Sequence, residues 1–146
     1  MKVDPQRRPG FAIARTSYLF RKRIIEELRH VGSALSPGEA WLLMVLHDAG
    51  GSLQTGALRE SMLRDSSTVT RQLDSACRKK LVRRERDRDD GRVINIVVTA
   101  TGRRELERVM PLSRNVRESA VSGIPKEHLR IMIDTLLKIQ ENLQSS

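Results

Sequence analysis

The stretch that decides the fold runs DSSTVTRQLDSACRKKL over residues 65–81, VRRERDRDDGRVINIVV over 82–98 and TATG over 99–102. In the first part, Val69, Leu73 and Ala76 recur at the spacing of one helix face. The second part places a charged turn, Asp90-Gly91, before a β-branched return strand, which is typical of a hairpin. The return strand is expected to run through Val93, Ile94, Ile96, Val97 and Val98. A polar-faced helix followed by an arginine-rich hairpin predicts a winged helix-turn-helix, in which the helix enters the major groove of DNA and the hairpin, or wing, reaches the neighbouring minor groove or backbone.

The predicted recognition helix carries one set of candidate DNA contacts. Arg71 is the first candidate for reading a base, because a bidentate contact between arginine and guanine is the commonest specific one. A phosphate contact or a solvated surface position is the alternative for Arg71. Hydroxyls near a helix start suit phosphates, although Ser66 or Asp65 is also expected to cap the helix. The candidates on this helix are Ser66, Ser67, Thr68, Thr70, Arg71, Ser75 and Arg78.

The wing carries a second set of candidates. Arginines that alternate with aspartates in a hairpin can contact the DNA backbone, but they can also form ion pairs with those aspartates within the hairpin. We therefore expect only about half of Arg83, Arg84, Arg86 and Arg88 to contact DNA. The candidate residues of the wing are Arg84, Arg86, Arg88, Asp90 and Arg92.

Charge and composition favour a polyanionic partner. The 146 residues carry a formal net charge of +9, and residues 64–104 hold twelve Lys/Arg against six Asp/Glu. The basic excess therefore lies on the predicted DNA-reading unit, although a generally basic, soluble surface would explain the charge alone. The single cysteine, Cys77, excludes an internal disulfide and fits a reducing cytoplasm, where we expect the protein to act. No apolar run approaches the length of a membrane span, and no secretion signal is visible.

Helices are predicted on both sides of this unit. Residues 1–10 are expected to form a loose arm before an amphipathic helix over 11–31. Ser36-Pro37-x-Glu39 predicts a capped helix start, and Gly50-Gly51 predicts its end. The buried side chains expected in that helix are Trp41, Leu42, Val45 and Leu46. The other expected elements are a strand stub at Leu53, a helix over 55–63, a helix that begins at 99–102 and a last helix after 124–125.

The outer helices predict a dimer. Residues 36–102 are enough to close a winged helix-turn-helix, so the apolar stripes outside them have no partner within that unit. A two-fold dimer would cover them and present two recognition helices to a pseudo-palindromic site. The expected organisation is an N-terminal arm and dimerisation helix (1–35), the winged unit (36–102) and C-terminal dimerisation helices (103–146), packed as one compact, mainly α chain with a small β-wing.

The order of short motifs resembles the MarR family of bacterial transcription regulators. The most specific match is the Asp-x-Arg of the wing, Asp90-Gly91-Arg92, followed by a return strand and Thr99-x-x-Gly102. The resemblance covers most of the chain in the right order. The other matching residues are Leu35, Ser36, Glu39, 67–71, Asp74, Leu81, Val82, Arg84, Asp87 and 137–143.

The resemblance implies a homodimeric winged-helix regulator, usually a repressor that a small molecule or oxidation relieves. It assigns Arg92 to the minor groove, whose negative potential attracts arginine, with Asp90 orienting the guanidinium. Two positions depart from the family pattern. Lys80 stands where glycine is common, which predicts about 1 kcal/mol of strain if the backbone there is left-handed. Ala76 stands where a larger apolar residue is usual, which predicts looser packing behind the recognition helix.

The resemblance also implies an effector cleft between the dimerisation helices and the winged unit. Its candidate lining is Arg15, Ser17, Tyr18 and Trp41, with Arg15 available to an anionic group of a small aromatic molecule. Tyr18 and Trp41 as plain core residues are the alternative. Cys77 as an oxidation sensor is weighed against a structural role, and the structural role is favoured because the chain has no second cysteine.

No enzyme, metal site or cofactor is expected. The three histidines are isolated in the sequence, and no nucleophile elbow or phosphate-binding loop is present. The leading hypothesis is therefore a ligand-responsive, DNA-binding transcription regulator. Two alternatives stay open: a constitutive winged-helix DNA-binding protein without an effector, and a winged-helix module that binds other proteins. Arg71, Arg78 and the arginines of the wing argue against the second alternative.

Overall fold

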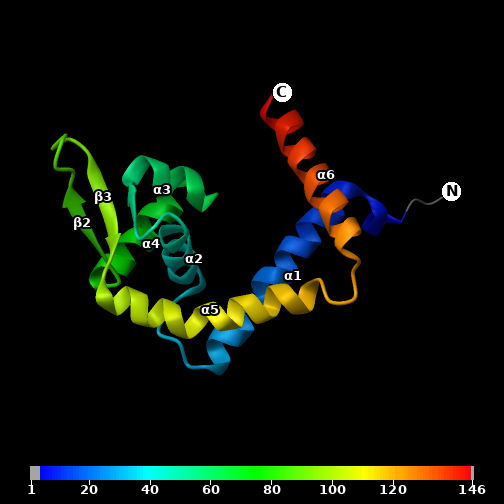
Figure 1. The fold of residues 1–146 in the computed structure, drawn as a ribbon, viewed down its shortest axis with the longest axis horizontal. Coiled ribbons are helices and arrows are strands. Elements are labelled where there is room, and N and C mark those ends of the chain that lie inside the picture. The colour runs from blue at the N-terminus through cyan, green and yellow to red at the C-terminus, as the bar shows by residue number, and fades with distance from the viewer. Residues whose placement is uncertain (1–3, 146) are drawn as a thin grey trace.

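The computed structural model describes residues 4–145 and has the mainly α architecture with a small β-wing that the sequence predicts. Figure 1 shows the winged unit at one end, two long helices crossing beneath it, and the last helix rising at the other end. The elements are a short 3-10 helix η1 (Pro5–Arg7), α1 (Pro9–His30), α2 (Pro37–Asp48), β1 (Ser52–Gln54), α3 (Thr55–Met62), α4 (Ser66–Arg78), β2 (Val82–Arg86), β3 (Ile94–Val98), α5 (Ala100–Ala120) and α6 (Lys126–Gln144).

Local sequence signals set the helix ends as predicted. Ser36 forms a capping box with Glu39, and Pro37 opens α2. Asp65, rather than Ser66, caps α4 by accepting a hydrogen bond from the amide of Thr68. Thr99 caps α5 by accepting from the amide of Gly102. The start of each helix in the winged unit that the sequence marked with a cap is therefore confirmed.

The core lies inside the winged unit, between the helices and one face of the sheet. The strands run antiparallel in the order β1-β3-β2, with Val82 opposite Val98 and Arg84 opposite Ile96. Side chains of the described core that are almost fully buried come from α2, α3, α4 and β3; they are Leu42, Leu43, Leu46, Leu58, Met62, Val69 and Ile96. Ala76 is fully buried too, so α4 packs closely at this position.

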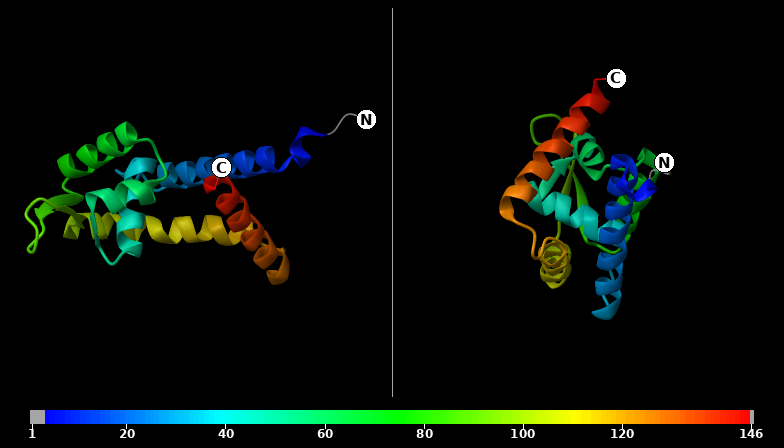
Figure 2. Two further views of the ribbon diagram at one scale, coloured as in Figure 1. Left: turned by 90° about the horizontal axis from the view of Figure 1, so that it is seen from above. Right: turned by 90° about the vertical axis from the view of Figure 1, so that its right-hand side faces the viewer.

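The same core extends into the outer helices. Leu28 of α1, and Leu106 and Val109 of α5, belong to the cluster that fills the winged unit. The winged unit is therefore not closed by residues 36–102 alone, and α1 and α5 are parts of its hydrophobic core at one end. Their other ends extend away from it, as the left view of Figure 2 shows.

Three expectations about local structure are wrong. The arm is ordered from Asp4 onward, since Asp4 caps η1 and α1 begins at Pro9; residues 1–3 lie outside the described residues. Trp41 is 42% exposed rather than buried, and its indole Nε1 donates to the carbonyl of Met62. Strand β3 begins at Ile94 rather than Val93, because the amide of Val93 bonds to the carbonyl of Asp90 within the turn.

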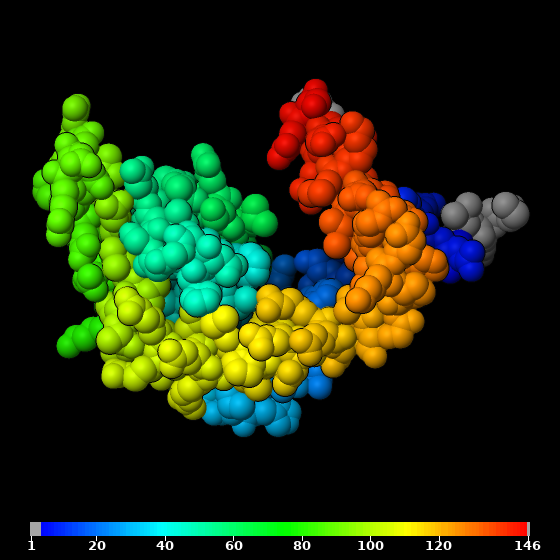
Figure 3. Space-filling model, in the orientation of Figure 1, coloured from blue at the N-terminus to red at the C-terminus, as the bar shows by residue number. Residues whose placement is uncertain are grey.

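The outer helices leave apolar side chains uncovered. No residue of α6 is buried. Figure 3 shows α6 standing across an open hollow from the winged unit. The large apolar side chains exposed on α1 and α6 are Phe11, Ile13, Tyr18, Leu19, Ile131, Met132, Ile133, Leu137 and Leu143. Apolar surface of this extent is unusual on a monomer and typical of an interface.

Candidate DNA-binding surface

The first turn of α4 is organised by Asp65. Its carboxylate accepts hydrogen bonds from the hydroxyls of Ser67 and Thr68, at 2.5 and 2.6 Å, and from the amide of Thr68 at 3.1 Å. These bonds, that from Ser67 first, hold the pKa of Asp65 well below the usual range of an aspartate. An ionised Asp65 therefore fixes two of the hydroxyls that the sequence predicted as DNA contacts.

Arg59 of α3 organises the other two hydroxyls. Its Nη1 donates to the carbonyl and the hydroxyl of Ser66, at 3.2 and 3.1 Å, and to the hydroxyl of Thr70 at 3.1 Å. The two helices of the helix-turn-helix are thereby joined by one guanidinium. Sequence reasoning missed Arg59, because a lone arginine on a short helix carries no pattern that shows where its side chain will reach.

Arg71 lies on the exposed face of α4, as predicted. Its Nη2 donates to the hydroxyl of Thr68 at 3.3 Å, so the guanidinium is turned back toward the helix start. Arg78 is also exposed, while Ser75 is half-buried beside the last turn. The structure thus keeps all seven candidates on one helix and concentrates five of them in its first two turns.

The wing is tied to α4 by an ion pair. Nη2 of Arg84 lies 2.7 Å from Oδ1 of Asp74. Arg83 pairs with Glu85 at 2.6 Å, and Arg86 donates to the carbonyl of Gly91 at 3.3 Å. Within residues 4–145, Arg88 has no ion pair.

Two aspartates shape the tip of the wing. Asp87 accepts from the amides of Asp89 and Asp90 and from the side chain of Asn95, and these bonds, that of Asn95 first, lower its pKa. Asp90 accepts from the amide of Arg92 at 3.0 Å and from its Nε at 3.4 Å. The side chain of Arg92 is nevertheless 94% exposed, so its guanidinium projects beyond the hairpin.

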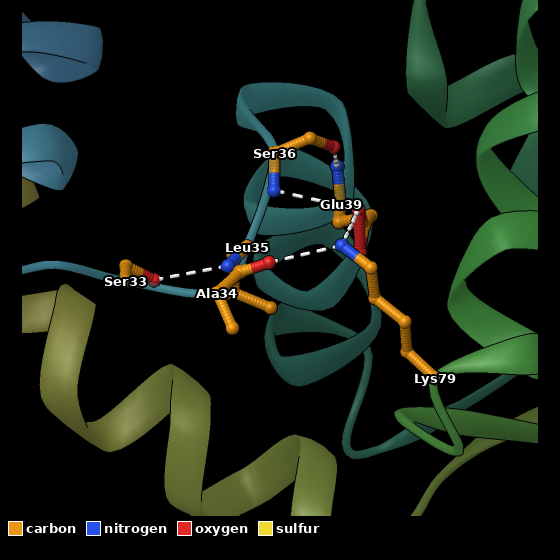
Figure 4. A network of polar contacts seen from close by, with 6 residues as sticks. All are labelled: Ser33, Ala34, Leu35, Ser36, Glu39 and Lys79. Atoms are coloured by element: carbon orange, nitrogen blue, oxygen red, sulfur yellow. Dashed lines mark hydrogen bonds and ion pairs between the residues drawn. The ribbon is translucent and has the colours of Figure 1, made fainter.

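A buried carboxylate anchors the far end of α4 (Figure 4). Glu39 is only 2% exposed, and its Oε1 lies 2.7 Å from Nζ of Lys79. The same Nζ donates to the carbonyl of Ala34 at 2.9 Å. These contacts join the end of α4 to the start of α2 and to the segment between α1 and α2.

The segment after α4 explains two motif residues. Lys80 has φ 59°, so the predicted left-handed backbone is present at a residue with a side chain. Thr99 donates to the carbonyls of Lys80 and Leu81. A Cβ on Gly102 would lie 2.1 Å from the carbonyl oxygen of Leu81, so only glycine fits at this position. The Thr99-x-x-Gly102 motif therefore holds residues 80–81, which follow α4, against the start of α5.

The predicted effector residues are placed on two helices. Arg15, Ser17, Tyr18 and Trp41 are all exposed in the described chain. A cavity of about 550 Å³ lies between α1 and α5, but none of these four lines it. Its walls carry an ion pair between Arg23 and Glu27, at 2.9 Å. The residues that line it are Thr16, Leu19, Phe20, Arg23, Glu27, Asn115, Val116, Ser119 and Ala120.

Residues 4–145 contain no group of three or more His, Cys, Asp or Glu that is placed to hold a metal ion. None of the described helices combines the length and hydropathy needed to span a membrane.

Comparisons with known proteins support the interpretation of this surface. Residues 34–93 match a model of the MarR family. The chain is 26% identical over 113 residues, covering 77% of its length and 68% of the relative's, to the uncharacterized HTH-type transcriptional regulator YdgJ of Bacillus subtilis (strain 168). The region that matches the family model contains the helix-turn-helix, β2 and the turn of the wing, and it ends just before β3.

Solved structures extend the likeness to the outer helices. A MarR family transcriptional regulator from Silicibacter pomeroyi shares 26% identity with a TM-score of 0.75, covering 91% of this chain and 88% of that one. CouR from Rhodococcus jostii RHA1, bound to p-coumaroyl-CoA, has the same fold, with a TM-score of 0.83, 22% identity and coverage of 94% and 95%. The resemblance predicted from the motifs is therefore confirmed over almost the whole chain.

Proposed function

We propose that this chain, a member of the MarR family of transcriptional regulators, binds a pseudo-palindromic duplex DNA site as a homodimer. In this proposal it represses transcription until a small molecule releases it from the site. The dimer, the operator and the repressor role go beyond family membership and are the parts that need testing.

The proposed DNA-binding surface consists of α4 and the wing. The observation that supports it is an exposed arginine at each of its two ends. Arg71 lies over the first turns of α4, and Arg92 projects from the wing tip. The Asp74–Arg84 ion pair holds these two elements together. A helix joined to a hairpin in this way suits a major groove and the minor groove beside it.

The arginines of the wing have two different roles in this proposal. Arg88 and Arg92 are the wing residues that we assign to DNA, since their charge is free or only loosely held. Arg84 and Arg86 hold the wing in place through Asp74 and the Gly91 carbonyl. Of the four arginines weighed together in the sequence, Arg83, Arg84, Arg86 and Arg88, this proposal assigns only Arg88 to DNA, which is fewer than the half expected.

The dimer is supported by the exposed apolar faces of α1 and α6, which belong to the proposed dimerisation segments 1–35 and 103–146. Covering these side chains with a second copy removes a large apolar area from water. A two-fold axis through this interface would place two copies of α4 on one side of the dimer.

The effector is proposed to be a small aromatic or anionic molecule. The location that we propose for it is the cavity between α1 and α5, because the predicted set Arg15, Ser17, Tyr18 and Trp41 is exposed and does not line this cavity. CouR holds p-coumaroyl-CoA in its crystal structure, which supports ligand binding in this fold. A ligand acts on DNA affinity only if it prefers one arrangement of the two recognition helices.

Sedimentation and salt titration test the proposal together. The protein is expected to sediment as a dimer at micromolar concentration and to lose DNA affinity steeply with salt, by about 10³–10⁵ between 50 and 200 mM for 6–10 phosphate contacts. A monomer contradicts the architecture, and a flat salt titration contradicts the DNA surface. An operator affinity that no aromatic carboxylate changes favours a constitutive DNA-binding protein.

A further inference from the structure

We propose that Thr68 and Asp65 are positioning residues that hold the guanidinium of Arg71 ready to read a guanine, and that Thr68 itself does not contact DNA. This inference rests on the proposed function, because it concerns the same face of α4. It also divides the hydroxyls of the first turns, which look alike in the sequence, into two groups with different roles.

The hydroxyl of Thr68 is engaged on both of its sides. An ionised carboxylate only accepts hydrogen bonds, so Oγ1 of Thr68 gives its single proton to Oδ1 of Asp65, 2.6 Å away. A guanidinium only donates, so Nη2 of Arg71 donates to the same Oγ1 at 3.3 Å. With its proton already shared, Thr68 has nothing left to donate to a DNA phosphate.

Asp65 keeps this arrangement fixed. It also accepts from the hydroxyl of Ser67 and the amide of Thr68, and these bonds keep its pKa below the usual range, so it stays ionised. A permanent negative charge at the helix start is stabilised by the helix dipole. The chain of contacts from Asp65 through Thr68 to Arg71 therefore begins at a firmly held group.

The consequence falls on Arg71. Its bond to Thr68, one turn earlier, draws the guanidinium over the part of the recognition helix that contacts base edges in helix-turn-helix proteins. Only one of its five N–H donors is used, so four remain, and a bidentate contact to O6 and N7 of guanine needs two. A side chain held in place before binding also loses less conformational entropy on binding.

Thr70 provides the contrast within the same helix. Its hydroxyl accepts from Nη1 of Arg59 at 3.1 Å and therefore keeps its own proton. It has no contact with Arg71 among the hydrogen bonds of the described residues. Thr70→Val thus makes the same chemical change as Thr68→Val without touching the chain of contacts that leads to Arg71.

The test uses the full-length protein and a duplex that the wild-type protein enriches from a randomised library. Each guanine of the enriched half-site is replaced in turn by 7-deazaguanine, which lacks the N7 acceptor. Wild-type protein is expected to lose roughly 5- to 150-fold in affinity at one guanine per half-site. Arg71→Ala is expected to lose this sensitivity to N7.

The variants of Thr68 separate positioning from contact. Thr68→Val should lose most of the N7 sensitivity, whereas Thr68→Ser and Thr70→Val should retain it. In the Arg71→Ala background, Thr68→Val should cause no further loss of DNA affinity. Asp65→Asn keeps a good helix cap but offers one acceptor oxygen in place of two, so it should lose part of the sensitivity by an independent route.

Four results would count against the inference. N7 sensitivity that survives Thr68→Val, together with an equal loss of affinity for every duplex, would mean that Thr68 contacts the DNA backbone. A further loss in the Arg71→Ala background would also mean that Thr68 acts directly. A wild-type protein without N7 sensitivity at any guanine would overturn the role of Arg71, while one that enriches no sequence would overturn the proposed function as well.

Discussion

Arg84 on the wing and Asp74 on the recognition helix form an ion pair, with 2.7 Å between Nη2 and Oδ1. Both side chains are nearly half exposed, so the pair contributes less than about 1 kcal/mol to stability. Its importance is geometric, because it joins the two elements that must enter neighbouring grooves together. In the absence of DNA, the ion pair also neutralises the charge of Arg84.

Arg84 and Arg88 should therefore respond differently to salt. Arg88→Ala is expected to reduce the slope of log affinity against log salt concentration by about 1, because a free arginine releases counterions when it meets a phosphate. Arg84→Ala should leave the slope unchanged, while weakening binding by loosening the wing. Fluorescence anisotropy across a salt series measures both slopes, and an equal reduction in the two variants would contradict this division of roles.

Arg92 should read groove width rather than sequence. Its exposed guanidinium is held only loosely by Asp90, at 3.4 Å, and a narrow A·T-rich minor groove has the stronger negative potential. Arg92→Ala is expected to weaken binding most for duplexes with A·T-rich flanks. Affinities for matched duplexes with A·T- and G·C-rich flanks measure the effect, and an equal loss on both would count against minor-groove insertion.

Gly102 should tolerate no side chain. A Cβ there would approach the carbonyl oxygen of Leu81 to 2.1 Å, so Gly102→Ala is expected to destabilise the fold by about 1–3 kcal/mol or more. Gly56 in α3 is the matched control, since a Cβ there meets nothing within 4 Å. Gly56→Ala should be stabilising by about 0.4–1 kcal/mol. Urea unfolding measures the free energy of unfolding of both variants. Similar changes in the two would show that the close contact between residue 102 and Leu81 can relax.

Most of the fold followed from local signals in the sequence. The capping box at Ser36, the apolar spacing of Val69 and Leu73, and the β-branched run of β3 each determine their element through nearby residues. The prediction that Trp41 is buried was wrong, because the burial of a helical side chain depends on which other elements cover it. Residues outside an element decide burial, and helical spacing alone does not reveal them.

The candidate site was predictable in its location but not in its hydrogen bonds. The sequence placed Ser66, Thr68 and Arg71 near the start of one helix, and the structure keeps them there. It did not show which hydroxyls Arg59 and Asp65 engage. The contacts of Arg59 depend on the angle between α3 and α4, and those of Asp65 depend on the side-chain rotamers at the start of α4. Pairing of Arg84 with Asp74 was hidden for the same reason, because it joins two elements ten residues apart.

Asp87 should make the stability of the wing depend on pH only in acid. Hydrogen bonds lower its folded pKa below the ordinary value of 3.8, so its contribution is fully present above that value and is lost as the pH falls through the folded pKa. We expect this contribution to be constant between pH 7 and about 5 and to decline below about pH 4.

Asp87→Asn should accordingly show a smaller decline in acid than the wild type, measured as the free energy of unfolding in urea. Asp89→Asn is the control, since the side chain of Asp89 makes none of the hydrogen bonds of the described wing. A decline in Asp87→Asn equal to that of the wild type would show that other carboxylates cause the acid sensitivity.

Lys80 should be replaceable by glycine with a gain in stability. Helix α4 ends in a Schellman motif, in which the amide of Leu81 bonds to the carbonyl of Ala76 and that of Lys80 to the carbonyl of Cys77. The motif requires a left-handed residue, and Lys80 supplies it at φ 59°. Helix α2 ends in the same way but with Gly50 at φ 88°, so the chain contains its own unstrained example.

Lys80→Gly is therefore expected to be stabilising by about 1 kcal/mol, because it relieves the contact between Cβ and the backbone. Lys80→Ala keeps the Cβ while it removes the charge, so it should leave the free energy of unfolding nearly unchanged. Thermal and urea unfolding of both variants measure the difference. If Lys80→Ala gained as much as Lys80→Gly, repulsion among the basic residues around α4, rather than backbone strain, would be the source of the gain.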